Sequence, residues 1–231
     1  GAKYFLDWLV RHDELEFTFE DEAKYKDAAK DAFGRREKSL PRVPPKGAVD
    51  LMIKMAKAQQ IYSPIKERDV AIILVLATSG MRRSEVQYLT VGDVDLENHK
   101  LFIEKGKGSK DRFAFISDEA AMAIRTYWDV RRWEHNNDSP AFARHDKRVS
   151  TNHAFMTSQA IYEVVRRIAK SAGLEGFTPH KFRHDVVTRL VQKAGVSAAK
   201  DIIGHESIAT TQGYTHITQE ELQEIHKQVF G

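Results

Sequence analysis

Cysteine is absent from this 231-residue chain. Its absence excludes a disulfide framework, a zinc site built on thiolates and a cysteine nucleophile. Long apolar runs are also missing, because the most apolar stretch, residues 71–77, is far shorter than the about 20 residues of a membrane-spanning helix. The first ten residues lack the basic region and apolar run of a signal peptide. With 42% hydrophobic and 30% charged residues, the composition is that of a soluble globular protein, and we expect no membrane partner.

A large excess of charge of one sign is missing too, since the net charge is only +3. That value is weak evidence for a nucleic-acid partner, so the distribution of charge along the chain has to be considered. Acidic side chains outnumber basic ones in residues 1–40, whereas basic side chains gather in 100–112 and 180–200. Taken alone, each basic run is most simply a solvated face.

Proline and glycine concentrate in residues 40–47, LPRVPPKG, which is the composition of a linker. We therefore place a domain boundary near residue 40. Residues 1–40 carry short helical patterns at 3–12 and 20–33, and residues 41–231 form the main domain. Because the chain has no initiator methionine, we expect it to be cut from a longer protein.

Hydrophobic periodicity after residue 47 is mostly helical. Ser63 and Pro64 suit the cap and first position of a helix that stops at Gly80, and Thr178 suits the cap of a helix that stops at Gly195. Residues 100–116 alternate apolar and polar side chains around a glycine-rich basic turn, which predicts a hairpin. The fold class is thus mainly α with a small antiparallel sheet or hairpin (α+β). Further helices are expected at 48–59, 118–133, 157–172 and 218–229.

The helix that opens at Thr178 places His180 and Arg183 three residues apart, on one face of its first turn. Free backbone N–H groups and the helix dipole favour an anion there, a phosphate above all, although two polar residues at a helix start are also ordinary surface. His180 and His184 have the spacing of two metal ligands. The residues between them are cationic and no glutamate accompanies them, so we expect no metal site.

Two other basic stretches suit phosphate binding. SGMRRSE, residues 79–85, has two adjacent arginines with Glu85 close enough to orient one of them. GKGSKDR, residues 106–112, is rich in glycine and lysine but lacks the spacing of a P-loop. A surface arginine pair and a solvated turn are the simpler interpretations of each stretch in isolation.

The order of the motifs is more specific than any one of them. R-x-S-E, a G-K-G hairpin, P-H-x-x-R-H, and G-H followed nine residues later by Y-T-H together resemble the tyrosine recombinases, also called the phage integrase family. The resemblance covers roughly residues 41–231. Ser79 stands where the family has threonine and Met81 where it has leucine, and neither change touches a catalytic group. Phe182 and Ile203 likewise replace leucines that the family often has.

The resemblance implies a mainly helical catalytic domain with a small sheet, preceded by a helical DNA-clamping domain. Residues 1–40 are too few for that whole domain, so they are either its remnant or a reduced version. Tyr214 would be the nucleophile rather than a packing aromatic, and Glu85 would support the site. The implied catalytic residues are Arg82, Lys107, His180, Arg183, His205 and Tyr214. Which hairpin lysine is the general acid stays open, because Lys105 and Lys110 flank Lys107.

The implied reaction cleaves and rejoins DNA through a 3′-phosphotyrosyl intermediate, with neither a cofactor nor ATP. Double-stranded DNA is the expected partner, with backbone contacts from Lys105, Lys110, Arg112 and Lys181. The family works as a tetramer on DNA, and residues 218–231 could mediate that assembly or pack on their own domain. A cytoplasmic, nucleoid-associated protein of prokaryotic, viral or mobile-element origin is expected.

Three alternatives share part of this pattern. A type IB topoisomerase relaxes DNA with similar chemistry as a monomer. A metal-dependent integrase or nuclease needs clustered carboxylates, and the sequence shows no such constellation. A DNA-binding relative could keep the fold without the reaction, although all six catalytic positions are filled here.

Overall fold

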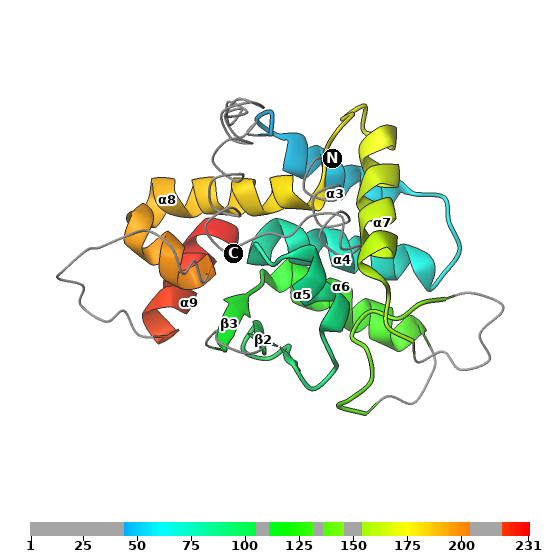
Figure 1. Cartoon of the computed structure of the whole chain (residues 1–231), viewed down its shortest axis with the longest axis horizontal. Coiled ribbons are helices and arrows are strands. Elements are labelled where there is room, and N and C mark those ends of the chain that lie inside the picture. The colour runs from blue at the N-terminus through cyan, green and yellow to red at the C-terminus, as the bar shows by residue number, and fades with distance from the viewer. Residues whose placement is uncertain (1–43, 105–110, 132–135, 146–153, 204–218) are drawn as a thin grey trace, which may run out of the picture. The chain divides into compact units, whose positions relative to one another are not determined.

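The computed structural model describes residues 44–104, 111–131, 136–145, 154–203 and 219–231, which lie within one unit, Val43–Gly231 (Figure 1). The helices expected at 3–12 and 20–33, and with them the prediction for residues 1–40, lie outside the described residues.

Helix α4, Ile65–Ser79, is the central helix of this unit. Its residues from Ala71 to Ser79 are all buried, as expected of a helix that is apolar on every side. It contacts α3 (Ala48–Ala58), α6 (Asp118–Val130), α7 (Ser158–Ser171) and α8 (Pro179–Ile203), and Figure 1 shows it between them. The core of the domain is therefore built around α4.

The predicted start of α4 was wrong by one residue. Pro64, not Ser63, is the N-cap, and no side chain caps the helix. The carbonyl of Tyr62 instead accepts from the backbone N–H groups of Ile65 (3.1 Å) and Lys66 (3.3 Å), so a backbone turn replaces the expected serine cap. Gly80 ends the helix in a left-handed conformation, as predicted.

Side-chain caps begin helices α6 and α7. The Ser117 hydroxyl accepts from the backbone N–H of Ala120 (3.2 Å) at the start of α6. The Thr157 hydroxyl accepts from the backbone N–H of Ala160 (3.1 Å) at the start of α7. Each hydroxyl satisfies one of the backbone donors that a helix start leaves unpaired. Both helices were predicted from their hydrophobic periodicity, at 118–133 and 157–172.

The sheet has three antiparallel strands in the order β1 (Val94–Asp95), β2 (Lys100–Ile103), β3 (Arg112–Phe115). The predicted hairpin is β2–β3, in register from Lys100 opposite Phe115 to Ile103 opposite Arg112. Strand β1 was not predicted, because two residues are too few to show an alternating pattern. Most of the hairpin tip, residues 105–110, lies outside the described residues.

Helix α8 breaks at Gly195, whose φ of 83° and ψ of 171° are not helical, and then continues to Ile203. Helix α9 (Gln219–Phe230) packs on α8, where Leu222 joins an apolar cluster with Val186 and Leu190. The predicted C-terminal helix is therefore present and contacts its own domain. Its packing on a neighbouring protomer stays a prediction.

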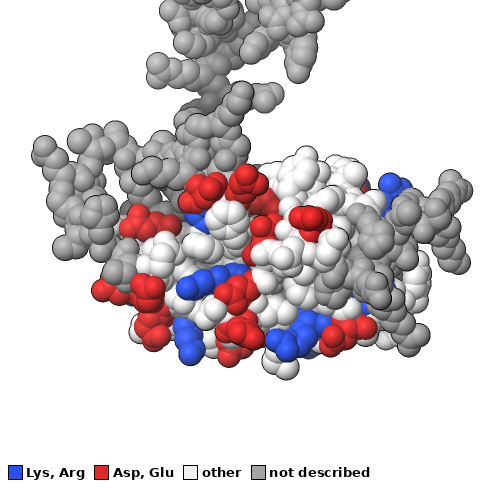
Figure 2. All heavy atoms as spheres, turned by 90° about the horizontal axis from the view of Figure 1, so that it is seen from below, with Lys and Arg blue, Asp and Glu red and all other residues white. Residues whose placement is uncertain are grey.

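Charges of both signs are interspersed on the face shown in Figure 2. Among the described residues of that face, basic side chains form no separate patch of the kind that marks a nucleic-acid footprint. None of the helices in the described ranges is long and apolar enough to cross a membrane.

Candidate active site

The turn between α4 and α5 (Arg83–Tyr88) brings the R-x-S-E motif against α8. Gly80 has a φ of +63°, and a Cβ on it would lie 2.6 Å from Cδ1 of Ile203 in α8. Only glycine combines this backbone conformation with such a close approach. The Ser79 hydroxyl accepts from the backbone N–H of Met81 (3.2 Å) and tightens the turn. Arg82 is thereby fixed as the N-cap of α5.

Glu85 orients Arg82 from both ends. One carboxylate oxygen accepts from the backbone N–H of Arg82 (2.7 Å) and the other from its Nη1 (3.0 Å). The first of these bonds is the reach-back contact of a capping box. The Arg82 side chain remains 47% exposed, so its guanidinium is held by Glu85 and still accessible.

Arg112 of β3 reaches the same carboxylate, with its Nη2 donating to Glu85 (2.9 Å). Burial alone would raise the pKa of Glu85, but Arg112 and the bonds from Arg82 outweigh burial and hold that pKa below its ordinary value. Burial lowers the pKa of Arg112, whose side chain is 9% exposed. Glu85 is therefore an ionised carboxylate that forms ion pairs with two arginines.

Arg183, in the first turn of α8, is only 4% exposed. Its Nη1 donates to the carbonyl of Gly80 (2.6 Å) and its Nη2 to the carbonyl of Ile203 (3.3 Å). Burial and the positive charge of Arg82 lower its pKa to about 10, which leaves it protonated at neutral pH. Two backbone carbonyls thus fix the position of this second guanidinium.

His180 lies one position into α8 and is exposed. Its ring meets that of His184 edge to face, with the centroids 4.5 Å apart. Burial, followed by the charges of His180 and Arg183, lowers the pKa of His184. Over the described part of the chain, no group of three metal-ligating side chains includes this pair.

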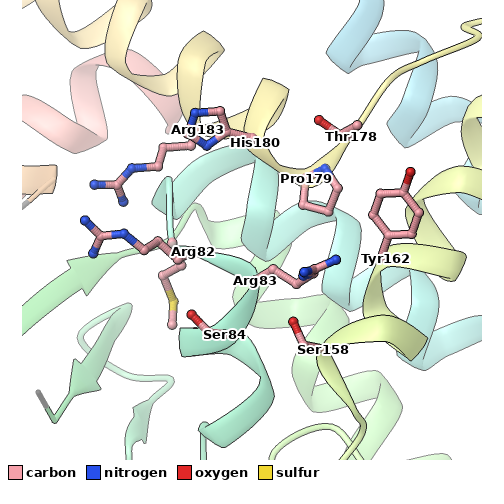
Figure 3. A pocket seen from close by; sticks show the side chains of 10 residues that line it. Arg82, Arg83, Ser84, Ser158, Tyr162, Thr178, Pro179, His180 and Arg183 are labelled. Carbon is pink, nitrogen blue, oxygen red and sulfur yellow. The ribbon is translucent and has the colours of Figure 1, made fainter. Parts of the chain in front are cut away.

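A cavity of about 380 Å³ opens between α5, α7 and α8 (Figure 3). Figure 3 shows the guanidiniums of Arg82 and Arg183 facing each other, with the His180 ring beside Arg183. Two permanently charged, preoriented guanidiniums can each bind oxygens of one phosphate and stabilise charge that develops on them. An imidazole beside them can accept or donate a proton. The arrangement therefore suits chemistry at a phosphodiester.

The structure thus brings together Arg82, His180, Arg183 and the supporting Glu85. Lys181, a predicted DNA contact, lies with its ammonium 5.8 Å from the ring centroid of Phe177. The remaining predicted residues lie outside the described residues: Lys105, Lys107, Lys110, His205 and Tyr214.

Three residues of this cavity were not singled out from the sequence: Ser158, Tyr162 and Thr178 in a binding role. Ser158 and Tyr162 are four residues apart on α7 and therefore share a face. That spacing was visible in the predicted helix at 157–172. Only the packing of α5 on α7 shows that this face meets the arginine motif.

Comparison with known proteins agrees with this geometry. The family model described as "Phage integrase family" matches residues 45–221. The chain is 31% identical over 185 residues to tyrosine recombinase XerA of Thermococcus kodakarensis, which covers 80% of this chain and 62% of that protein. It is 31% identical over 178 residues to tyrosine recombinase XerC of Oceanobacillus iheyensis, which covers 75% of this chain and 57% of that protein.

Solved structures share the fold. The crystal structure of XerA recombinase matches with a TM-score of 0.62 and 30% identity, over 84% of this chain and 66% of that one. The Tn1549 transposon integrase in complex with circular intermediate DNA matches with a TM-score of 0.58 and 21% identity, over 94% and 82%. The chain spans about three fifths of the length of the curated relatives named above. On the match over residues 45–221 and the motifs that form its cavity, the chain belongs to the phage integrase family.

Proposed function

We propose that residues 41–231 are the catalytic domain of a site-specific DNA recombinase, which cleaves and rejoins strands through a 3′-phosphotyrosyl intermediate. The observation that carries this proposal is the cavity in which Arg82 and Arg183 face each other beside His180. Its support is the family of the chain and the relatives named tyrosine recombinase. Two arginines at a phosphodiester can stabilise the charge that develops when a strand is cleaved or rejoined.

Tyr214 is the proposed nucleophile. Its phenolic oxygen bonds to phosphorus while the bond from phosphorus to the 5′ oxygen breaks. The phenolic proton passes to His180, and Lys107 gives a proton to the departing 5′ oxygen. A phenol with an ordinary pKa near about 10 needs such a base at neutral pH.

Charge on the phosphate is the other barrier to attack. Arg82 and Arg183 bind the two non-bridging oxygens, and His205 donates a further hydrogen bond. The phosphotyrosyl bond retains the energy of the phosphodiester, so a 5′-hydroxyl can reverse the step without ATP. The reaction therefore needs neither a metal nor a nucleotide cofactor.

Two supporting roles follow from the contacts around Glu85. Glu85 holds Arg82 in place, and Arg112 balances the charge of Glu85 from β3. We assign Arg112 to this support as well as to the DNA backbone. Lys105, Lys110 and Lys181 are proposed as backbone contacts, which would make binding fall steeply with salt.

Double-stranded DNA is the proposed partner, and a tetramer on DNA is the proposed assembly, with residues 218–231 at its contacts. Residues 1–40 are proposed to belong to a DNA-clamping domain. We place the protein with the DNA of a prokaryotic cell or of a mobile element. Relatives from bacteria and archaea and the Tn1549 transposon integrase support that setting.

The test begins by selecting the DNA site that the protein binds. Binding of the Tyr214→Phe variant would select duplexes from a randomised library. A nicked suicide version of a selected duplex is then incubated in EDTA with wild-type protein or with Tyr214→Phe. We expect a covalent protein–DNA band on a denaturing gel for the wild type only.

A band for both proteins would assign the nucleophile elsewhere, and no band for a wild type that binds the duplex would refute the reaction. Loss of the band in EDTA would indicate a metal-dependent enzyme. Relaxation of supercoiled DNA at enzyme concentrations too low for self-association would indicate a topoisomerase.

A further inference from the structure

The cavity is larger than the pair of arginines that the proposed reaction uses. In Figure 3 the side chains of Arg82 and Arg83 run in opposite directions from the start of α5. Arg82 extends toward Arg183, whereas Arg83 extends toward Tyr162 of α7, and both arginines line the same cavity. Three guanidiniums therefore line one cavity, and the proposed chemistry at a single phosphate uses only those of Arg82 and Arg183.

An aromatic ring contacts the guanidinium of Arg83. The Arg83 guanidinium carbon lies 5.5 Å from the centroid of the Tyr162 ring, a cation–π contact. The side chain is half-buried, and within the described ranges no carboxylate pairs with it. In this respect Arg83 differs from Arg82, which Glu85 holds. Stacking on an aromatic ring orients a guanidinium while leaving its N–H groups available to an anion.

Hydroxyl groups surround that position. Ser158, Tyr162 and Thr178 line the cavity on the side of Arg83, from α7 and from the start of α8. Hydroxyls and guanidiniums are among the side-chain donors that proteins use for DNA phosphates. Contacts of this kind do not recognise a base. They fix the position of the strand along the protein.

We propose that Arg83, with the hydroxyls of Ser158 and Tyr162, binds a second phosphate of the cleaved strand, adjacent to the phosphate held by Arg82 and Arg183. This subsite rests on the proposed function, since it requires that the strand enter the cavity. Two phosphates of one strand held on opposite sides of the start of α5 would fix the position of the scissile bond. Arg83 is then a substrate-binding residue that positions the reacting phosphate.

The probe is thymidine 3′,5′-bisphosphate, a short DNA fragment with two phosphates on one deoxyribose. Thymidine 5′-monophosphate, which has only one phosphate, is the comparison ligand. Each is titrated into the full chain, and affinity is followed from amide and guanidinium NMR signals. A charge-assisted hydrogen bond contributes enough to expect about tenfold tighter binding of the bisphosphate to the wild type.

Arg83→Gln should abolish that preference and leave the affinity for the monophosphate within about twofold of wild type. The matched control is Arg166→Gln, which removes an exposed arginine of α7 that pairs with Glu163 at 3.6 Å. The control should keep the full preference. If Arg83→Gln lost the wild-type amide spectrum, Arg83→Lys would replace it, and loss of bidentate geometry should cut the preference at least about threefold.

An unchanged preference in the folded Arg83 variant would overturn the proposal, and so would a wild type without any preference. Either result would reduce the contact with Tyr162 to a structural one. The titration needs neither cleavage nor Tyr214. A missing covalent band alongside the expected preference would therefore refute the recombinase reaction alone, whereas a band without the preference would refute only the subsite.

Discussion

The cluster around Glu85 and the cluster around Asp69 each place one carboxylate between a buried arginine and a half-exposed one. At Glu85 the buried arginine is Arg112, with 9% of its side chain exposed, and the half-exposed one is Arg82, with 47%. Asp69 of α4 is fully buried, and its arginines are 8% and 48% exposed. Each cluster therefore pairs one carboxylate with two arginines of similar exposure, although Asp69 is more deeply buried than Glu85.

The two clusters differ in the groups that the half-exposed arginine contacts besides the carboxylate. At Asp69 that arginine is Arg167, whose Nε donates to the Gln59 side chain (3.0 Å) while its Nη2 bonds Asp69. The buried Arg68 adds a bond to the carbonyl of Ala143 (3.1 Å). These bonds join α4, α7 and the end of α3, so the Asp69 cluster is a link between helices.

Arg82 instead turns its guanidinium into the cavity, with Glu85 as its holder. The same pairing of charges therefore links helices where the half-exposed arginine bonds Asp69 and Gln59, and we propose that it serves binding where the guanidinium faces an open cavity. The comparison predicts that changes at Asp69 act on stability and that changes at Arg82 act on the reaction.

The largest effect is expected for Asp69→Asn. Removing the buried carboxylate charge leaves Arg68 buried without its partner, which should lower the free energy of unfolding by about 3–5 kcal/mol. Urea denaturation measures the change. The control is Asp118→Asn, which removes an exposed aspartate paired with His99 at 3.0 Å and should cost at most about 1 kcal/mol. Equal losses of unfolding free energy in the two variants would show that the buried Asp69 cluster contributes no more to stability than an exposed ion pair.

The next effect concerns Arg82→Lys. Lysine keeps the charge but loses the planar fork, so we expect the cleavage rate of the nicked substrate to fall about 10²–10³-fold. Stability should change by less than about 1 kcal/mol, because the side chain is 47% exposed. Single-turnover kinetics measure the rate.

The matched variant is Arg167→Lys, which changes the half-exposed arginine of the Asp69 cluster. It should leave the cleavage rate of the folded protein within about threefold of wild type, because Arg167 lies outside the cavity. A larger loss for Arg167→Lys than for Arg82→Lys would reverse the roles of the two clusters.

The sequence located features whose signals are local. The helical patterns at 118–133 and 157–172, the stop at Gly80 and the β2–β3 hairpin each depend on a few neighbouring residues. Helix α5, with six residues, is too short to show periodicity and was not predicted. Local rules therefore predicted most of the elements and missed the short ones.

Some residues of the site were predicted from the sequence, whereas their contacts with distant segments were not. Arg82, His180 and Arg183 were found because they stand in motifs whose order resembles a family. The partnership of Arg167 with Asp69 spans 98 positions and follows no short spacing, and the approach of Tyr162 to Arg83 depends on how α5 packs on α7. Contacts between distant segments require the packed fold, because spacing rules describe only neighbours on one element.

The smallest effect is expected from the pH dependence of the Glu85 cluster. Burial alone raises the pKa of Glu85, yet Arg112 and Arg82 leave it below the ordinary value, so the folded protein binds fewer protons at this site than the unfolded chain. The resulting stability is present above the unfolded pKa of about 4.3 and is lost as the pH falls through the folded pKa.

Urea unfolding of the wild type and of Glu85→Gln, from neutral pH down into that range, measures this pH-dependent stability. The variant should be less stable near neutral pH and approach the wild type in acid, because a protonated Glu85 resembles glutamine. A difference that stayed constant with pH would show that Glu85 acts through packing and neutral hydrogen bonds, and the likeness between the two carboxylate clusters would then not extend to their charge.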